Sequence, residues 1–152
     1  LLYTTLVHIG NQEYKTAKKY ISNAIIDHNI KYLPLMRTIR LVRLIVFYEV
    51  QEHELIQYES RSITRSLSSP KEQTFKTERI ILWFLNKRNI PILRKDREAF
   101  WEKLSPEIHE LYNNKYESQL LRLFDFTAWM ESKIRKEKLS EVLRARSSAK
   151  EC

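Results

Sequence analysis

Apolar side chains recur along one stripe of a segment near the start of the chain. Tyr14, Ala17, Ile21 and Ala24 are spaced three, four and three residues apart, so a helix places them on one face. A small residue lets a neighbouring helix approach closely, and a bulky residue fills the groove beside it. The alternation of large and small side chains therefore predicts a helix that packs in an antiparallel pair.

The same periodicity, read together with helix start and stop signals, divides the chain into about eight helices. Leu2, Leu6 and Ile9 already follow a helical pattern at the start. The next three helices are expected over residues 11–29, with Asn11 as N-cap, over 34–49, with Pro34 in the first turn, and over 55–68, after a break near Gln51. A further helix runs from 70 to just before Asn89, and the one after it holds Phe100, Trp101, Leu104, Ile108 and Leu111. The last two cover 116–134 and 139 to about 144.

Short motifs mark several of these boundaries. Ser69-Pro70-Lys71-Glu72 combines an N-cap serine, a proline at the first helical position and a glutamate that completes a capping box. Asn114 with Glu117 repeats this logic and opens the most regular amphipathic stretch, 116–134, which we expect to be the most buried helix. Ser105-Pro106 should kink or split the helix that contains it.

Composition supports an all-helical fold. The 152 residues include 43% hydrophobic residues, enough for a core, but only one glycine and four prolines, which leaves little material for tight hairpins. A single helix pair cannot bury its apolar face alone and must stack on its neighbours. We therefore expect an all-α protein of antiparallel helix pairs stacked as a short α-α solenoid, in one domain over 1–146 followed by a frayed polar tail over 147–152.

The ends of the chain and its cysteine content suggest a setting. The first residue is leucine and a helical pattern is already running there, so we expect a piece of a longer protein whose preceding residues cover Leu1, Leu2 and Leu6. The longest apolar run, Leu44 to Tyr48, is far too short to span a bilayer. Cys152 is the single cysteine, which excludes an intrachain disulfide and a cysteine metal cluster. A reducing, cytoplasmic location fits best.

The Tyr14, Ala17, Ile21, Ala24 stripe resembles the second helix of a tetratricopeptide repeat, and Gly10 lies close to where that family turns between its two helices. A second repeat would offer Leu55, Tyr58, Ser62 and Arg65 at the corresponding positions, which departs from the pattern because an aromatic residue stands where a small one belongs. The resemblance implies a solenoid of helix pairs with a concave binding surface.

The last third of the chain resembles the ends of large, uncharacterised tetratricopeptide-type proteins of the Bacteroides group of bacteria. The similar segments are Leu123-Phe124-Asp125-Phe126, Ala128 to Ile134, and Ser140-Glu141-Val142. This resemblance implies a fold and a position within a larger protein, and it carries no activity.

An arginine row is the best candidate binding site. Arg37, Arg40 and Arg43 are the main polar residues of an otherwise apolar helix, and their three-residue steps place them on one slowly drifting face. In tetratricopeptide-like solenoids the first helix of each pair lines the concave surface, where such a row could hold a partner's carboxylates through bidentate hydrogen bonds. The alternative is a set of internal salt bridges to Glu49, Glu52, Glu54 and Glu59 on adjacent helices.

Aromatic residues surround this candidate and mark the core. Tyr32 and Tyr48 flank the arginine row and could form the rim of a recognition surface, although packing in the core is the alternative. Trp83, Trp101 and Trp129 lie on helix stripes beside leucine and phenylalanine, which predicts that they pack between helices.

The remaining polar residues favour structural roles. Asp125, between two phenylalanines, would need a cation such as Arg122 or a lysine or arginine of a neighbouring helix. The basic run Lys133, Arg135, Lys136 and Lys138 suits a helix carboxyl end. His8, His28, His53 and His109 form no pair at metal-ligand spacing, and no phosphate loop, nucleophile elbow or carboxylate pair indicates an enzyme or a cofactor.

Three functions remain in competition. The first is a non-catalytic scaffold for protein–protein interaction that receives an acidic peptide or a partner helix at the arginine row. The second is a basic module that binds nucleic acid through this row and the run 133–138, although the net charge of +8 is spread along the chain rather than concentrated. The third is a structural cap at the end of a larger solenoid.

Overall fold

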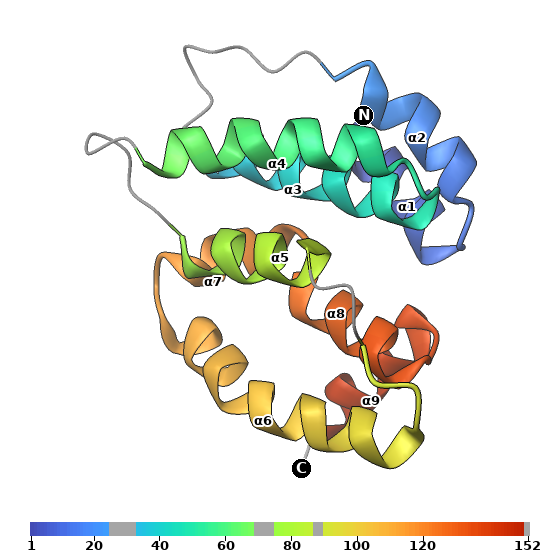
Figure 1. The fold of residues 1–152 in the computed structure, drawn as a ribbon, viewed down its shortest axis with the longest axis vertical. Helices are drawn as coiled ribbons and strands as arrows, with labels where there is room; N and C mark the ends of the chain where they lie inside the picture. Colours follow the sequence, from blue (N-terminus) through green and yellow to red (C-terminus); the bar gives the residue numbers. More distant parts are fainter. Residues whose placement is uncertain (25–32, 69–74, 87–89, 151–152) are drawn as a thin grey trace. The chain divides into compact units, whose positions relative to one another are not determined.

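The chain is helical throughout the part that the structure describes. The computed structural model describes residues 1–24, 33–68, 75–86 and 90–150. These residues form nine helices and no strand, which confirms the predicted all-α class (Figure 1). The helices are α1 (Leu2–Gly10), α2 (Tyr14–Ser22), α3 (Pro34–Glu49), α4 (His53–Leu67), α5 (Lys76–Asn86), α6 (Arg94–Asn113), α7 (Glu117–Leu123), α8 (Phe126–Arg135) and α9 (Leu139–Lys150).

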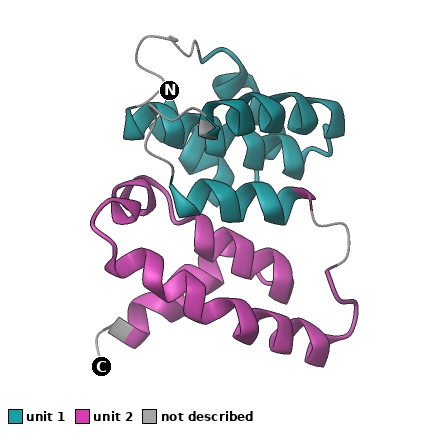
Figure 2. Cartoon of the chain, turned by 60° about the vertical axis from the view of Figure 1, so that its left-hand side comes forward, with its two compact units in different colours: residues 1–85 teal, residues 86–152 magenta. Residues whose placement is uncertain are grey.

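The chain forms two compact units, residues 1–85 and residues 86–152 (Figure 2). We call them unit 1 and unit 2. Unit 1 contains α1 to α4 and nearly all of α5, and unit 2 contains α6 to α9. Compactness alone does not make either unit a separately folding domain, so the single domain expected over 1–146 stays a prediction.

In unit 1, helices that follow one another in the chain pack against one another: α1 on α2, α2 on α3, and α3 on α4. The stripe that the sequence singled out is the packing face of α2, because Ala17 and Ile21 are fully buried and Ala24, just beyond the helix, is buried too. Most of α3 is buried: Leu41, Val42 and residues 44–46 are inaccessible to water, whereas Leu35 near its start is 48% exposed. The tetratricopeptide-like arrangement itself remains a prediction.

Several helix boundaries follow the sequence signals and others do not. Pro34 begins α3, as expected. Asn11 was predicted to cap α2, but it ends α1 instead, and the N-cap of α2 is Glu13. Helix α2 ends at Ser22, well before Asn29, which lies outside the described residues. The predicted capping box at 69–72 also lies outside them.

The turns after α1, α3 and α8 share one geometry. In the first of these turns Asn11 is the C-cap of α1, so it is not the N-cap of α2. Gln12, Gln51 and Lys136 have positive φ, and the amide that follows each one donates to a carbonyl five residues back in the preceding helix. This is the Schellman ending, in which glycine usually takes the left-handed position. The chain has one glycine, so glutamine and lysine adopt this conformation here.

The predicted helix over 116–134 is two helices. It breaks at Phe124, and Asp125 becomes the N-cap of α8 by accepting a hydrogen bond from the Ala128 amide at 3.0 Å. An aspartate offers the backbone this alternative to helix continuation. Asn114 Oδ1 accepts from the amides of Tyr116 and Glu117 in the turn ahead of α7, but the N-cap of α7 itself is Tyr116. Conversely, α6 is not split, and Pro106 lies inside it.

Two further expectations were wrong. Residues 147–150, expected in a frayed tail, belong to α9, which extends to Lys150. Trp101 and Trp129 are buried as predicted, but Trp83 is 44% exposed. Trp83 lies on the side of α5 opposite the buried apolar residues of this helix. Because two leucines lie close to it in the sequence, helical spacing alone could not show that its side chain is outside the core.

The glutamine in the turn after α3 gives a stability prediction. Gln51→Gly should stabilise the protein by about 0.5–1 kcal/mol, because glycine adopts positive φ without the steric cost that a side chain imposes. The same change at exposed Gln57, inside α4, should destabilise by about 1 kcal/mol through lost helix propensity. Chemical denaturation of both variants tests this, and an equal effect of the two changes would contradict the role of the turn.

Candidate functional site

The predicted arginine row lies inside unit 1. Arg37 and Arg40 are buried, with 3% and 8% of their surfaces exposed. The Nη1 of Arg37 donates to Oε2 of Glu78 on α5 at 2.9 Å, and its guanidinium lies 4.9 Å from the centre of the Phe75 ring. Arg37 therefore joins α3 to α5 and its surroundings rather than facing solvent.

The other two arginines also bond within the unit. Arg40 donates to the Ser62 hydroxyl at 3.1 Å. Arg43 donates to Glu59 of α4 at 2.9 Å and to the carbonyl of Ala24 at 2.5 Å. The expectation of an exposed row that holds a partner is corrected here, because Arg37 and Arg40 are buried and all three arginines bond to groups within unit 1. For Arg43, the alternative of a salt bridge to Glu59 is confirmed.

Of the two tyrosines predicted beside the row, one lies outside the described residues and the other packs between helices. Tyr32 lies outside the described residues. Tyr48 is half-buried, and its ring centre lies 6.4 Å from that of Phe84. Burial, and secondly the charge of Glu49, raise the pKa of the Tyr48 phenol above its usual value. Tyr48 thus contributes to packing between α3 and α5.

A basic hollow lies on the outer side of α2. Lys15 and Lys19 lie on the face opposite the buried stripe and Lys18 lies beside it, and the three line a depression of about 580 Å³ together with Ser22, Asn23, Val50 and Glu52. Lys18 pairs with Glu52, whereas Lys15 and Lys19 make no ion pair with any residue that the structure describes. We call these three lysines the lysine face. Their spacing was a signal that the sequence analysis did not use.

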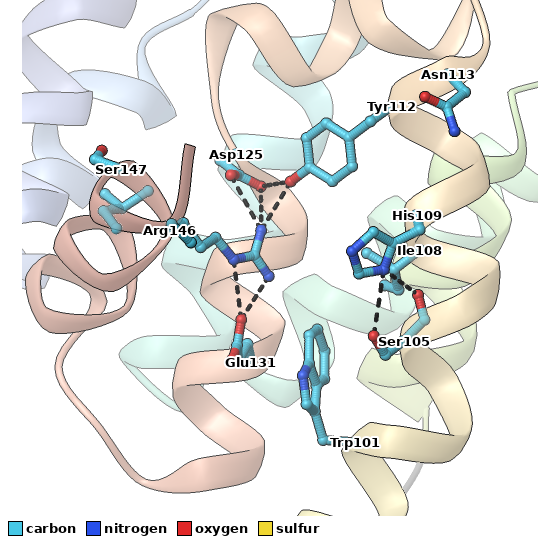
Figure 3. Close-up of a pocket in the computed structure, with 12 residues that line it drawn as sticks. Trp101, Ser105, Ile108, His109, Tyr112, Asn113, Asp125, Glu131, Arg146 and Ser147 are labelled. Carbon is cyan, nitrogen blue, oxygen red and sulfur yellow. Dashed lines mark hydrogen bonds and ion pairs between the residues drawn. The ribbon is translucent and has the colours of Figure 1, made fainter. Parts of the chain in front are cut away.

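Unit 2 contains a cleft of about 540 Å³ (Figure 3). One wall is a face of α6 that carries Trp101, Ser105, His109 and Tyr112, and the opposite wall is α9 with Arg146. Helices α6 and α9 both pack on α8, which supplies Glu131. The cleft combines an aromatic surface with several convergent polar groups, the usual constitution of a ligand site.

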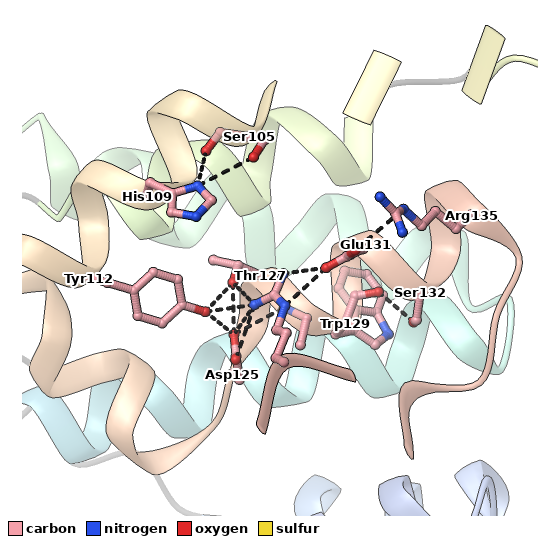
Figure 4. A network of polar contacts seen from close by, with 11 residues as sticks. Ser105, His109, Tyr112, Asp125, Thr127, Trp129, Glu131, Ser132 and Arg135 are labelled. Atoms are coloured by element: carbon pink, nitrogen blue, oxygen red, sulfur yellow. Dashed lines mark hydrogen bonds and ion pairs between the residues drawn. The ribbon is translucent and has the colours of Figure 1, made fainter. Parts of the chain in front are cut away.

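Arg146 is the centre of a polar network along this cleft (Figure 3). Figure 4 shows its acceptors Tyr112, Asp125, Thr127 and Glu131 gathered in this network. Its Nη1 donates to the Tyr112 hydroxyl at 2.8 Å, to Thr127 Oγ1 at 2.8 Å and to Asp125 Oδ2 at 3.2 Å. Its Nε and Nη2 both donate to Oε2 of Glu131, at 3.0 and 2.6 Å. One guanidinium therefore bonds to two carboxylates and joins α6, α8 and α9, and Arg135 also pairs with Glu131.

The network changes the acidity of its members. Burial and the hydrogen bond to Asp125 raise the pKa of the Tyr112 phenol to about 12. Burial lowers the pKa of Arg146, but the hydrogen bond to Glu131 and the charge of Asp125 outweigh it, so the net direction is upward. Arg146 thus stays charged and Tyr112 stays a neutral donor at physiological pH.

The residues that the sequence marked near this cleft have structural roles. Asp125 has the predicted cationic partner, and it is Arg146 of a neighbouring helix rather than Arg122. The run 133–138 forms the carboxyl end of α8, with Lys136 in the turn. His109 bonds to Ser105, and the described residues contain no histidine, cysteine and carboxylate group that could hold a metal ion. Arg146 itself was missed because it lay in the segment read as the approach to a frayed tail.

Comparison with protein-family models, with curated proteins and with solved structures found no match for this chain. The likeness to tetratricopeptide repeats therefore stays a prediction from the residues that carry it. Among the helices that the structure describes, none is both long and apolar enough to cross a membrane.

Removing Arg37 should destabilise the protein strongly. Arg37→Ala removes one partner of the buried ion pair with Glu78, and the loss of one partner of such a pair costs about 3–5 kcal/mol. Arg61→Ala, at an exposed position of α4, should change the free energy of unfolding by no more than about 0.5 kcal/mol. Urea denaturation measures both, and the double change Arg37→Met with Glu78→Met should recover most of the loss if the uncompensated charge is its cause.

Tyr112 should make the protein sensitive to alkali. The phenol has a pKa of about 12 in the folded state, above the value of about 10 for an unfolded tyrosine. Its contribution to stability is therefore complete below pH 10 and is lost as the pH rises to about 12. Thermal unfolding across this range should show a shallower decline for Tyr112→Phe than for the wild type, and parallel declines would contradict the assignment.

Proposed function

We propose that this chain is a non-catalytic helical-repeat scaffold that mediates protein–protein interaction, with the lysine face of α2 as the contact for an acidic peptide or partner helix. The observation that carries the proposal is the hollow formed by Lys15, Lys18 and Lys19, in which two ammonium groups have no ion-pair partner among the described residues. The cytoplasm is the proposed location, since the chain has a single cysteine.

The placement of these lysines favours recognition over a purely solvated surface. The opposite face of α2 is anchored by Ala17 and Ile21, so the lysines extend from a helix whose position is held by packing. Lys18 pairs with Glu52, and both residues line the hollow. Carboxylates of a partner would meet a local excess of positive charge, which raises the association rate and selects against basic partners.

The nucleic-acid alternative loses part of its support. It relied on Arg37, Arg40 and Arg43 as contacts to phosphates, and two of these guanidiniums are buried while the third bonds to Glu59 and to a carbonyl. Phosphate contacts require cations that reach the surface. The tetratricopeptide likeness and the paired helices of unit 1 favour a protein partner instead.

Charge reversal on the lysine face tests the proposed function. The double variant Lys15→Glu, Lys19→Glu should bind a fluorescent polyglutamate peptide at least about tenfold more weakly than the wild type, a loss of about 1.4 kcal/mol. The matched control is Lys95→Glu with Lys103→Glu, at exposed positions of α6, which alters net charge equally. Fluorescence anisotropy at low and moderate salt is the measurement.

The control decides the interpretation. If both double variants lose affinity equally, the peptide responds to net charge alone and the lysine face is not a site. If neither loses affinity, acidic segments do not bind there. Wild-type binding should weaken as salt rises, because exposed charges are screened beyond about 8 Å at physiological ionic strength.

A further inference from the structure

The groups that hold Arg146 form a complete receptor for a guanidinium without any contribution from α9. Every acceptor of Arg146 belongs to α6, to α8 or to the N-cap of α8: the Tyr112 hydroxyl, Asp125, Thr127 and Glu131. Trp101 of α6 adds an aromatic surface, with its ring centre 5.8 Å from the guanidinium carbon. Two carboxylates and an aromatic face are the groups that select arginine in recognition sites.

This receptor is open to water. The side chains of Arg146 and Asp125 are 24% and 23% exposed, whereas the pair Arg37 and Glu78 in unit 1 is 4% and 5% exposed. The cleft of about 540 Å³ continues from Arg146 along α6 past His109 and Ser105 (Figure 3). A side chain that comes from outside therefore has a path to the carboxylates, which a sealed salt bridge would not offer.

Helix α9 is held by few other contacts. Of its residues, Leu139 and Val142 are buried, Leu143 is 39% exposed, and most of the others face solvent. Arg146 is the one charged residue of α9 for which the structure shows an ion pair within the described chain. The attachment of the second half of α9 thus depends on a single side chain in an accessible site.

We propose that α6 and α8 form an arginine-binding site that α9 fills with Arg146, and that an arginine on a partner polypeptide takes the place of Arg146. The partner's arginine enters along the cleft, bonds to Asp125 and Glu131, and releases the second half of α9. This site is in unit 2 and does not depend on the lysine face. It adds a second, oppositely charged point of contact to the scaffold.

The chemistry of the site discriminates among ligands. An anionic ligand would meet Asp125 and Glu131 and displace no cation, so it is disfavoured. A lysine supplies one point charge, whereas the planar guanidinium fork reaches Asp125, Tyr112 and Glu131 at once. The occupant of choice is therefore arginine.

Variants that empty the site provide the test. The probes are a labelled alanine-based helical peptide with one arginine and its counterpart with lysine. Because the tethered Arg146 competes at a high effective concentration, Arg146→Ala should bind the arginine peptide at least about tenfold more tightly than the wild type. The lysine peptide should bind Arg146→Ala more weakly than the arginine peptide, and Arg146→Ala with Glu131→Gln should lose the gain.

Two further readouts keep the test decisive. If Arg146→Ala does not fold, Arg146→Lys is the second variant. Its lysine retains the positive charge but cannot make all the hydrogen bonds of the guanidinium, so the same order of affinities is expected. In the wild type, the arginine peptide should speed amide hydrogen exchange in α9 over 143–150. Equal binding by the wild type and the emptied variants, equal binding of both peptides, or unchanged exchange at saturating peptide would overturn the proposal. Lys15→Glu with Lys19→Glu should leave these results unchanged, so the two proposals fail separately.

Discussion

Arginine side chains enclosed among short helices impose the constraint on which both units depend. An enclosed guanidinium must meet acceptors for its donors and a carboxylate for its charge. In unit 1, Arg37 meets Glu78 and Arg43 meets Glu59, so one central helix is joined to α5 and to α4. In unit 2, Arg146 meets Asp125 and Glu131 together. Each pairing joins two different helices and so constrains how they pack.

The same constraint decides which cations remain for recognition. Arginine suits enclosed positions because its guanidinium is more weakly hydrated than an ammonium and presents a rigid fork. Lysine keeps its charged end in water while its stem lies along the surface. Accordingly, the arginines of α3 are used within the fold, and the lysines of α2 are available outside it. Arg146 stands between these cases, since it is paired yet reachable from a cleft.

Helix ends show how local signals compete. Asp125 has the chemistry of an N-cap, and it lies within a stretch whose apolar stripe runs from Tyr116 to Ile134, on the side opposite that stripe. The cap prevails, and the resulting break allows the aspartate to turn toward Arg146. Pro106 shows the opposite result, because the helix continues through it. The same kinds of local signal, a capping residue and a proline, therefore have opposite outcomes in the two helices.

The helical class, the buried stripe of α2, the start of α3 and the break after it could be predicted from the residues alone, because periodicity, proline and the lack of glycine act over a few neighbouring residues. The need of Asp125 for a cation could be predicted in the same way. The burial of Arg37 and Arg40, the exposure of Trp83, and the network that Arg146 completes with Tyr112 and Glu131 could not be predicted without the three-dimensional arrangement. Those outcomes depend on which helix packs against which face. Contacts between residues far apart in the chain produce no periodic pattern or spacing in the sequence from which they could be predicted.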